Sequence, residues 1–255
     1  MPERHKGQRH GVFQRLLPGV RLLPKRAHQP KARGADADAQ ALCTLFERVE
    51  ALGVHNLNLV TPTHFAPAVI RALKMRKPRV PVVWNCGGYE RPEIIAALRG
   101  LVDVYLPDLK YYSEQSARDI AGAPGYFAVA SRAVRAMREQ TGPARYDAEG
   151  LLVGGTMIRH LVLPLRVNES IKILDFIKNE LPGGTPVSLM RQYTPMNGVA
   201  IKGLDRRLTT REYARARDHM LALGLPGYVQ GKDAATAAFT PDFDDAESMR
   251  LMEGL

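Results

Sequence analysis

Five short polar motifs stand at or beside the ends of apolar segments, and their side chains could hold a small polar ligand. They are TPTH at 61–64, NCGGY at 85–89, PDLK at 107–110, RH at 159–160 and RQY at 191–193. Gly87 and Gly88 could let a backbone approach a ligand closely and offer bare N–H groups. Asp108 and Lys110 lie two residues apart, so on an extended segment both point to one face and could grip a zwitterion or a ribose.

Each motif also has a plainer interpretation. A pair of glycines at a strand end is more often a turn, and Asp108 with Lys110 could be an exposed ion pair of little consequence. His64 and His160 lack the spacing of metal ligands, so we predict no metal there. Arg159 stands inside an apolar strand, where a buried guanidinium needs an anionic partner.

The elements that must position these motifs alternate along the chain. Hydrophobic periodicity predicts strands over 55–60, 80–85, 102–106, 157–163 and 187–190. It predicts helices over 39–52, 67–77, 92–101, 113–120 (with Ser113 as N-cap), 126–140, 168–181 and 210–223. This alternation favours a single α/β domain with a parallel sheet, either a complete or partial (β/α) barrel or an open doubly wound sheet. In both folds the carboxyl ends of the strands share one face, so the polar motifs indicate a site.

Composition limits the class of protein. The chain has 255 residues, 45% of them hydrophobic and 24% charged, which is typical of a globular protein with one sizeable core. No apolar run approaches the roughly 18 residues of a membrane span, so no membrane association is expected. Cys43 and Cys86 are too few for a disulfide framework and indicate a reducing compartment, so we expect a cytoplasmic protein with Cys86 as a small buried side chain.

The net charge of +10 is concentrated at one end. Residues 1–33 contain nine Lys or Arg and a single acid, which leaves only about +2 for the other 222 residues. We predict a disordered or aberrant basic segment over 1–38, an α/β barrel domain over 39–228 and a loosely attached tail over 229–255. Nucleic acid is not an expected partner of the body, which has no basic patch with interleaved aromatic residues. A salt-dependent nucleic-acid binder using residues 1–33 is a third, weaker hypothesis.

Six segments resemble the radical S-adenosylmethionine (radical SAM) superfamily, in particular proteins similar to the pyruvate formate-lyase activating enzyme. They are HNLNLVTPTHF at 55–65, VVWNCGGYE at 82–90, VDVYLPDLKYY at 102–112, MIRHLVLP at 157–164, LMRQYTP at 189–195 and RRLTTREY at 206–213. The resemblance implies a partial (β/α)6 barrel, S-adenosylmethionine, a [4Fe–4S] cluster and generation of a 5′-deoxyadenosyl radical. It also implies a glycyl-radical enzyme or other protein substrate as partner, and an electron donor such as flavodoxin or ferredoxin.

The resemblance further implies which residues contact S-adenosylmethionine. They are Asn85, Gly87, Gly88, Tyr89, Asp108, Lys110, Arg159, His160 and Gln192. The glycine loop would contact the methionyl amino group, and the D-x-K element would lie near the ribose or the carboxylate. Tyr193 is the alternative to Gln192, and Thr61 and Asn85 are weaker candidates. Members of the family often have glycine after RHLVLP, whereas this chain has Leu165.

The family's defining C-x3-C-x2-C motif, whose thiolates would bind the cluster, is absent. A shift of reading frame accounts for the gap. Read one nucleotide out of register, codons 7–30 permit GSGTVFFSGCSLGCVFCQNAHISQ, with the cysteine codons at Leu16, Val20 and Leu23. We hypothesise that residues from about 6 to 31 are a frameshifted translation, so the chain as written cannot hold the cluster and is inactive. The rival hypothesis is a natural, non-catalytic S-adenosylmethionine-binding or degenerate barrel protein.

Overall fold

The computed structural model describes residues 38–195 and 201–230. Its strands are β1 (Leu57–Val60), β2 (Val82–Cys86), β3 (Val104–Pro107), β4 (Arg145–Tyr146), β5 (Leu152–Thr156), β6 (Ile158–Leu161), β7 (Val187–Met190) and β8 (Gly227–Val229). Its helices are α1 (Ala39–Ala51), η2 (a 3-10 turn, Pro62–Phe65), α2 (Ala66–Met75), α3 (Pro92–Ala97), α4 (Glu114–Ala121), α5 (Tyr126–Thr141), α6 (Val167–Glu180) and α7 (Thr210–Ala222).

The strands form two sheets that follow one another as a single curved surface. One sheet has the order β1-β2-β3-β5-β4, with β4 antiparallel at its edge, and the other has the parallel order β6-β7-β8. Met157 alone separates β5 from β6, and its N–H donates to Tyr105 O at 3.0 Å. A parallel bridge between Asp108 and Arg159 joins β3 to β6. In the described residues β1 and β8 do not pair, so the surface is an open partial barrel.

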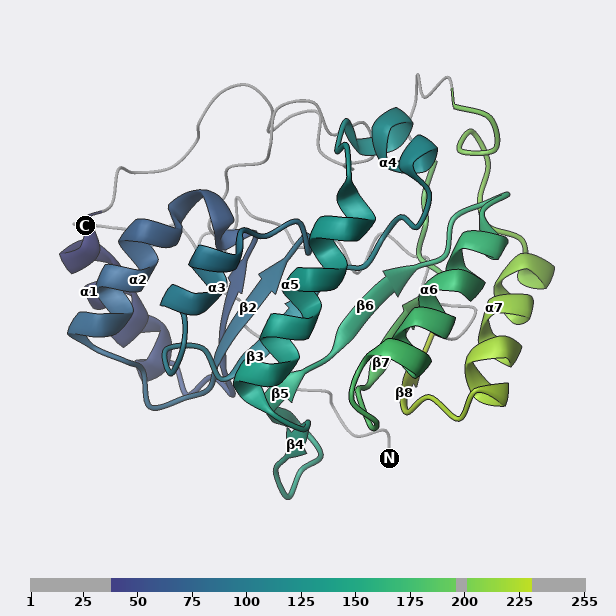
Figure 1. Ribbon diagram of the computed structural model, residues 1–255. Coiled ribbons are helices and arrows are strands. Elements are labelled where there is room, and N and C mark those ends of the chain that lie inside the picture. Colours follow the sequence, from purple (N-terminus) through teal and green to yellow (C-terminus); the bar gives the residue numbers. More distant parts are fainter. Residues whose placement is uncertain (1–37, 196–200, 231–255) are drawn as a thin grey trace.

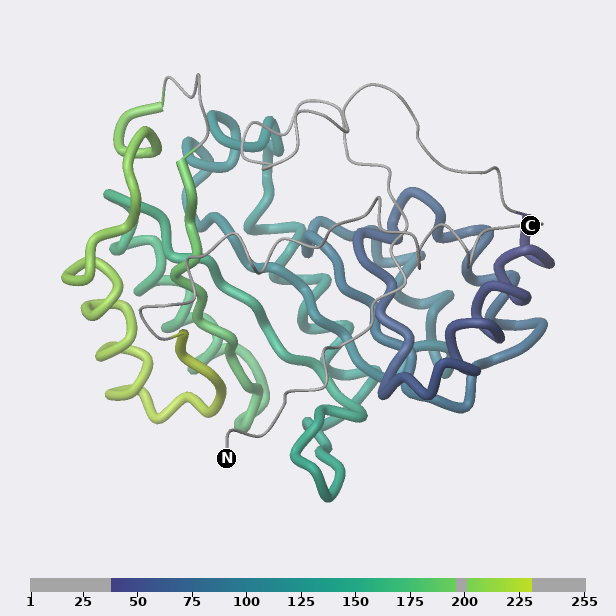
Figure 2. Tube along the Cα trace, turned by 180° about the vertical axis from the view of Figure 1, so that it is seen from behind, coloured from purple at the N-terminus to yellow at the C-terminus, as the bar shows by residue number. Residues whose placement is uncertain are grey.

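Helices cover one face of this surface. In Figure 1, α3, α5 and α6 lie in front of the strands with α1 and α2 at the left, and Figure 2 shows the sheets from behind. Side chains alternate between the two faces of a strand. Val82, Trp84 and Cys86 on β2 pack into the core beneath α1, α2 and α3, which places Val83 and Asn85 on the opposite side. We call this opposite side the inner face.

The predicted fold class is confirmed in these residues, and each predicted helix and strand has a counterpart. The predicted N-cap of α4 is also confirmed, because the Ser113 side chain accepts from the N–H of Ser116. Several bounds differ: the helix predicted over 92–101 ends at Ala97, and the strand predicted over 157–163 is confined to Ile158–Leu161. The short elements η2, β4, β5 and β8 were not predicted.

Some predictions concern residues outside those described. The basic segment, apart from Asp38, and the frameshift codons of Leu16, Val20 and Leu23 lie there, as does the tail after Gln230. Asp38 is the N-cap of α1, and its Oδ1 accepts from the N–H of Ala41 at 2.8 Å. The division into three parts stays a prediction. None of the helices in 38–195 and 201–230 has the length and apolar character needed to cross a membrane.

Candidate functional site

The centre of the site is one carboxylate held between two cations. Asp108 follows β3, and its Oδ1 lies 2.6 Å from Nη2 and 2.8 Å from Nε of Arg159 on β6. Its Oδ2 lies 3.0 Å from Nζ of Lys110. Burial opposes ionisation of Asp108, but Arg159 and Lys110 outweigh it and hold the pKa of the carboxyl below its usual range. Two positive charges facing one negative charge leave this triad with a surplus cation.

The glycine loop after β2 lies directly against the backbone of Asp108. Gly88 has φ +78°, and a Cβ built on it would lie 2.1 Å from the Asp108 carbonyl oxygen. Only glycine fits so close an approach in this backbone conformation. A Cβ on Gly87 would meet nothing within 4 Å.

Tyr126, the first residue of α5, joins the glycine loop to the Asp108–Lys110 segment. Its hydroxyl oxygen lies 2.8 Å from Asp108 O and 3.0 Å from Gly87 O, and it accepts the N–H of Lys110 at 3.0 Å. The ring of Tyr89 stacks on the Tyr126 ring, with centroids 5.9 Å apart and planes at 6°. Tyr89 is 40% exposed and donates its hydroxyl to Pro124 O at 2.8 Å. Sequence reasoning did not identify Tyr126 as a site residue.

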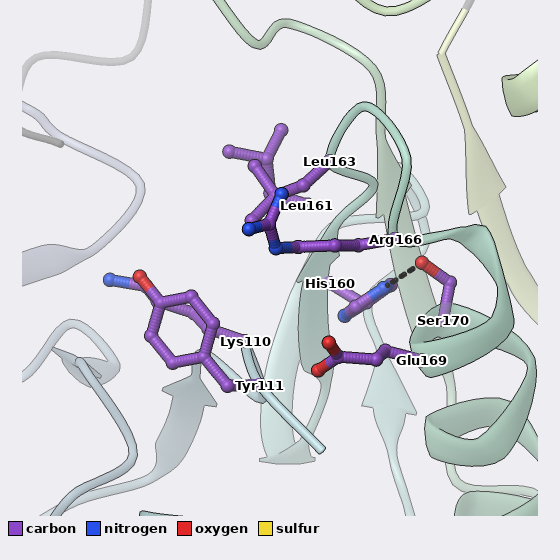
Figure 3. A pocket seen from close by; sticks show the side chains of 8 residues that line it. All are labelled: Lys110, Tyr111, His160, Leu161, Leu163, Arg166, Glu169 and Ser170. Atoms are coloured by element: carbon purple, nitrogen blue, oxygen red, sulfur yellow. Dashed lines mark hydrogen bonds between the residues drawn. The ribbon is translucent and has the colours of Figure 1, made fainter. Parts of the chain in front are cut away.

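His160 faces away from Arg159. Adjacent strand residues point to opposite faces, and His160 lies buried on the helix side of β6. Its Nδ1 is 2.6 Å from Leu109 O, and its Nε2 is 2.8 Å from the Ser170 hydroxyl on α6 (Figure 3). Because a carbonyl can only accept, the contacts fit a neutral ring that donates through Nδ1. Burial lowers the pKa of His160, which agrees with a neutral ring.

The remaining predicted residues lie on two other strands. Asn85 is buried on the inner face of β2, in register with Leu106 of β3. Gln192 follows β7 and is exposed, and its Oε1 accepts from the Gln230 side chain at 3.3 Å. Thr61, a weaker candidate, follows β1 as the N-cap of η2, with φ +54°. The structure therefore brings Gly87, Gly88, Tyr89, Asp108, Lys110 and Arg159 together. His160 touches this group only through the Leu109 carbonyl, from the helix side, and Gln192 contacts Gln230 instead.

A shallow pocket lies beside the triad at the end of β6 (Figure 3). Glu169 on its wall accepts from the N–H groups of Tyr112 at 3.1 Å and Ser113 at 3.0 Å, and from the hydroxyls of Ser113 and Ser116. Burial would raise the pKa of Glu169, but these hydrogen bonds outweigh it and lower the pKa. Glu169 thus anchors the start of α4 to α6 beneath the site.

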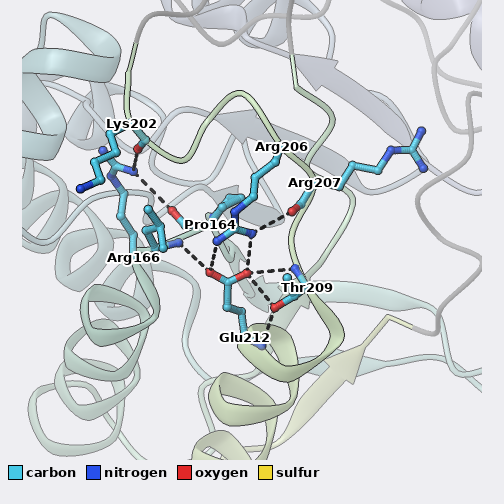
Figure 4. Close-up of polar contacts among 8 residues, drawn as sticks. Pro164, Arg166, Lys202, Arg206, Arg207, Thr209 and Glu212 are labelled. Atoms are coloured by element: carbon cyan, nitrogen blue, oxygen red, sulfur yellow. Dashed lines mark hydrogen bonds and ion pairs between the residues drawn. The ribbon is translucent and has the colours of Figure 1, made fainter.

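Leu165, which replaces the glycine common in the resembling family, takes a left-handed conformation. Its φ is +60°, and its side chain is 57% exposed. Its N–H donates to Glu212 Oε1 at 2.8 Å, and Arg206 pairs with both oxygens of Glu212 at 2.8 Å (Figure 4). Glu212 also completes the capping box of α7 with Thr209. The loop therefore keeps a backbone conformation that suits glycine, at a cost in strain.

Both cysteines lie on the helix side of the sheet, away from the triad. Cys43 on α1 donates its thiol to Ala72 O at 3.3 Å, and Cys86 is buried beside Glu90. Burial raises the pKa of both thiols, which disfavours the thiolates that a cluster requires. The described residues contain no group of three or more His, Cys, Asp or Glu side chains that could hold a metal. The residues described here therefore do not fit a [4Fe–4S] cluster.

Comparison with known proteins supports the fold. No protein family matches the chain. An uncharacterized protein of Methanocaldococcus jannaschii is 29% identical over 165 residues, which cover 63% of this chain and 44% of that protein. The chain thus spans less than half the length of this curated relative.

Several solved structures are similar to this chain. SuiB of Streptococcus suis has a TM-score of 0.57 at 11% identity, covering 83% of this chain and 48% of SuiB. A domain of pyruvate-formate lyase-activating enzyme from Bacteroides vulgatus has a TM-score of 0.44 at 13% identity, covering 76% of this chain and 91% of that domain. The likeness to SuiB shows the fold alone, a mixed α/β partial barrel that is not closed.

Proposed function

We propose that this chain binds S-adenosylmethionine on the inner face of the sheet and is related to the radical SAM activating enzymes. The observation that carries the proposal is the triad of Asp108, Arg159 and Lys110 at the carboxyl end of β3, directly beside Gly88. Ligands of open α/β sheets bind outside the carboxyl ends of the strands. The open partial barrel and the sequence resemblance support the same assignment.

The charges of the site suit the methionyl carboxylate of this ligand. S-adenosylmethionine carries a carboxylate, an ammonium and a sulfonium on its methionyl part and two neutral hydroxyls on its ribose. The surplus cation of Arg159 and Lys110 would attract the carboxylate. The Gly87–Gly88 loop and Tyr89 would contact the methionyl amino group. Asn85, on the strand before this loop, and Gln192, which follows β7, would make further contacts with the ligand. His160 would act indirectly, because it holds the Leu109 carbonyl next to Asp108.

The cluster is a separate question, because the cysteines described above cannot provide its ligands. In radical SAM proteins the cluster supplies the electron that cleaves S-adenosylmethionine. We therefore propose binding without catalysis for the chain as printed. We propose that the intact reading frame encodes the C-x3-C-x2-C motif and a cytoplasmic radical SAM enzyme. Its partners would be a protein substrate, such as a glycyl-radical enzyme, and an electron donor such as flavodoxin or ferredoxin.

Calorimetry with S-adenosylmethionine tests the binding proposal on the chain as printed. We expect measurable affinity that falls at least about tenfold in Lys110→Gln, since one charge-assisted contact contributes about 1.5 kcal/mol or more. Lys77→Gln is the matched control, because the Lys77 side chain is as exposed as that of Lys110 and is also paired with one carboxylate. Asp103 pairs with Lys77 at 2.7 Å and lies just before β3, at the opposite end of the strand. No binding by the wild-type chain, or equal losses in the two variants, would refute the proposal.

Sequencing of the coding DNA across codons 5–40 tests the frameshift. One extra or missing nucleotide near each end of this stretch would restore the motif at codons 16, 20 and 23. The corrected protein, reconstituted with iron and sulfide, should then be brown and bind the cluster. A confirmed reading frame would instead favour the natural cluster-less relative.

A further inference from the structure

We infer that Tyr126 is the positioning residue that fixes the separation between the Gly87–Gly88 loop and the Asp108–Lys110 segment. These two segments come from different strands, β2 and β3, and the Tyr126 hydroxyl contacts the backbone of both. The consequence for ligand binding rests on the proposed function, since both segments are assigned to S-adenosylmethionine there. The contact itself does not depend on that assignment.

The hydrogen-bonding capacity of the hydroxyl explains how one group joins two segments. A tyrosine hydroxyl has one proton to donate and can accept as well. It accepts the N–H of Lys110 at 3.0 Å, and its proton faces the carbonyls of Asp108 at 2.8 Å and Gly87 at 3.0 Å. Tyr126 is buried and only 3% exposed, so water does not compete readily for these groups.

The ring of Tyr126 is held in place by its neighbours. Tyr89 stacks on it at 5.9 Å, and Tyr111 meets it edge-on at 5.2 Å. The backbone is also fixed, because Gly125 caps α5 in a left-handed conformation and its N–H donates to Glu114 at 2.8 Å. A ring fixed in this way presents its hydroxyl at a defined point, as a positioning residue must.

The separation between the Gly87–Gly88 loop and the Asp108–Lys110 segment can change very little. Gly88 is already so close to Asp108 that a single methyl group would overlap the Asp108 carbonyl oxygen. The Tyr126 hydroxyl, which comes from α5, joins the same two segments. Without it, the Lys110 N–H loses its acceptor and the loop loses its link to β3. We expect the two segments to separate and the affinity for a ligand that bridges them to fall.

The first experiment uses the ligand-free chain. In Tyr126→Phe, hydrogen exchange of the Lys110 amide should accelerate about tenfold relative to wild type, the factor for one lost hydrogen bond. The matched control is Tyr105→Phe, which removes another buried tyrosine hydroxyl, 2.5 Å from Gln140 Oε1 and on the helix side of β3. The control should leave the exchange of the Lys110 amide unchanged. Both variants are compared at a temperature where circular dichroism shows them folded.

The second experiment measures S-adenosylmethionine affinity of the same proteins by calorimetry. We expect a loss of about tenfold in Tyr126→Phe and wild-type affinity in Tyr105→Phe. Unchanged Lys110 exchange in Tyr126→Phe would overturn the inference. Equal losses of affinity in both variants would also overturn it, because they would reflect general stability. If wild type binds no S-adenosylmethionine but Lys110 exchange accelerates only in Tyr126→Phe, the inference stands and the proposed function fails.

Discussion

Substitution of Gly88 by alanine should destabilise the protein far more than the same change at Gly87. At Gly88 the new Cβ would lie 2.1 Å from the carbonyl oxygen of Asp108 and 3.3 Å from its carbonyl carbon. The oxygen cannot easily yield, because the Asp108 N–H is bonded to Cys86 O at 2.9 Å within the sheet. At Gly87 the new methyl group would enter open space.

The magnitude follows from two costs. A non-glycine residue at the φ of +78° found at Gly88 costs about 1–2 kcal/mol. Forcing a methyl group against fixed neighbours costs about 1–3 kcal/mol more. We therefore expect Gly88→Ala to lower the free energy of unfolding by about 2–5 kcal/mol, a large part of the roughly 5–15 kcal/mol typical of a domain. Gly87→Ala should change it by less than about 1 kcal/mol.

Urea unfolding followed by tryptophan fluorescence provides the assay. The chain has one tryptophan, Trp84, which is fully buried on β2 just before the glycine loop. The midpoint should fall in Gly88→Ala while the slope stays that of wild type. Equal stability of the two alanine variants would refute the close contact between Gly88 and Asp108 on which the site depends.

Three further substitutions test other contacts. Leu165→Gly should raise the urea-derived free energy of unfolding by about 0.5–1 kcal/mol, because it relieves a left-handed leucine that is largely exposed; a lower value would contradict the strain. Burial raises the pKa of Glu90, so its folded state favours the protonated form and wild-type stability should decrease as pH rises from the unfolded pKa through the folded one. Glu90→Gln should flatten this dependence in urea titrations across pH 4–9, and an unchanged slope would exclude a buried neutral carboxyl. The pKa of Asp108 is lowered, so its stabilisation is present above the unfolded pKa and is lost as pH falls through the folded pKa. Asp108→Asn should cost about 1–3 kcal/mol at pH 7 and less at pH 3, and equal costs at both values would contradict the charged contact.

Glycine explains why two strands escaped sequence-based prediction. β5 contains Gly155 and β8 begins at Gly227, and both residues read as turn signals in a sequence. In the structure they permit close packing. A Cβ on Gly155 would lie 2.6 Å from Ala144 Cα, and one on Gly227 would lie 2.0 Å from Val187 O. The strands β1, β2 and β3 contain no glycine and were predicted.

The site was predictable where local rules apply. Arg159 in an apolar strand required an anion, and Asp108 at a neighbouring strand end provides it. The same alternation that turns Arg159 inward turns His160 outward, so its position was available from the sequence. The role of Tyr126 could not be predicted from the sequence, because it depends on where α5 begins relative to two strands that precede it in the chain.

The alternation of side chains between the two faces of each strand also separates two kinds of evolutionary change. Trp84 and Cys86 pack under the helices, so substitutions there act on folding. Leu106 and Ser188 belong to the opposite face, are only partly buried and leave those helix contacts untouched. A library randomised at these two codons could explore new ligand preferences while it retains the folded scaffold. Substitutions that change ligand specificity and substitutions that change stability can therefore accumulate in the same strands with little effect on one another.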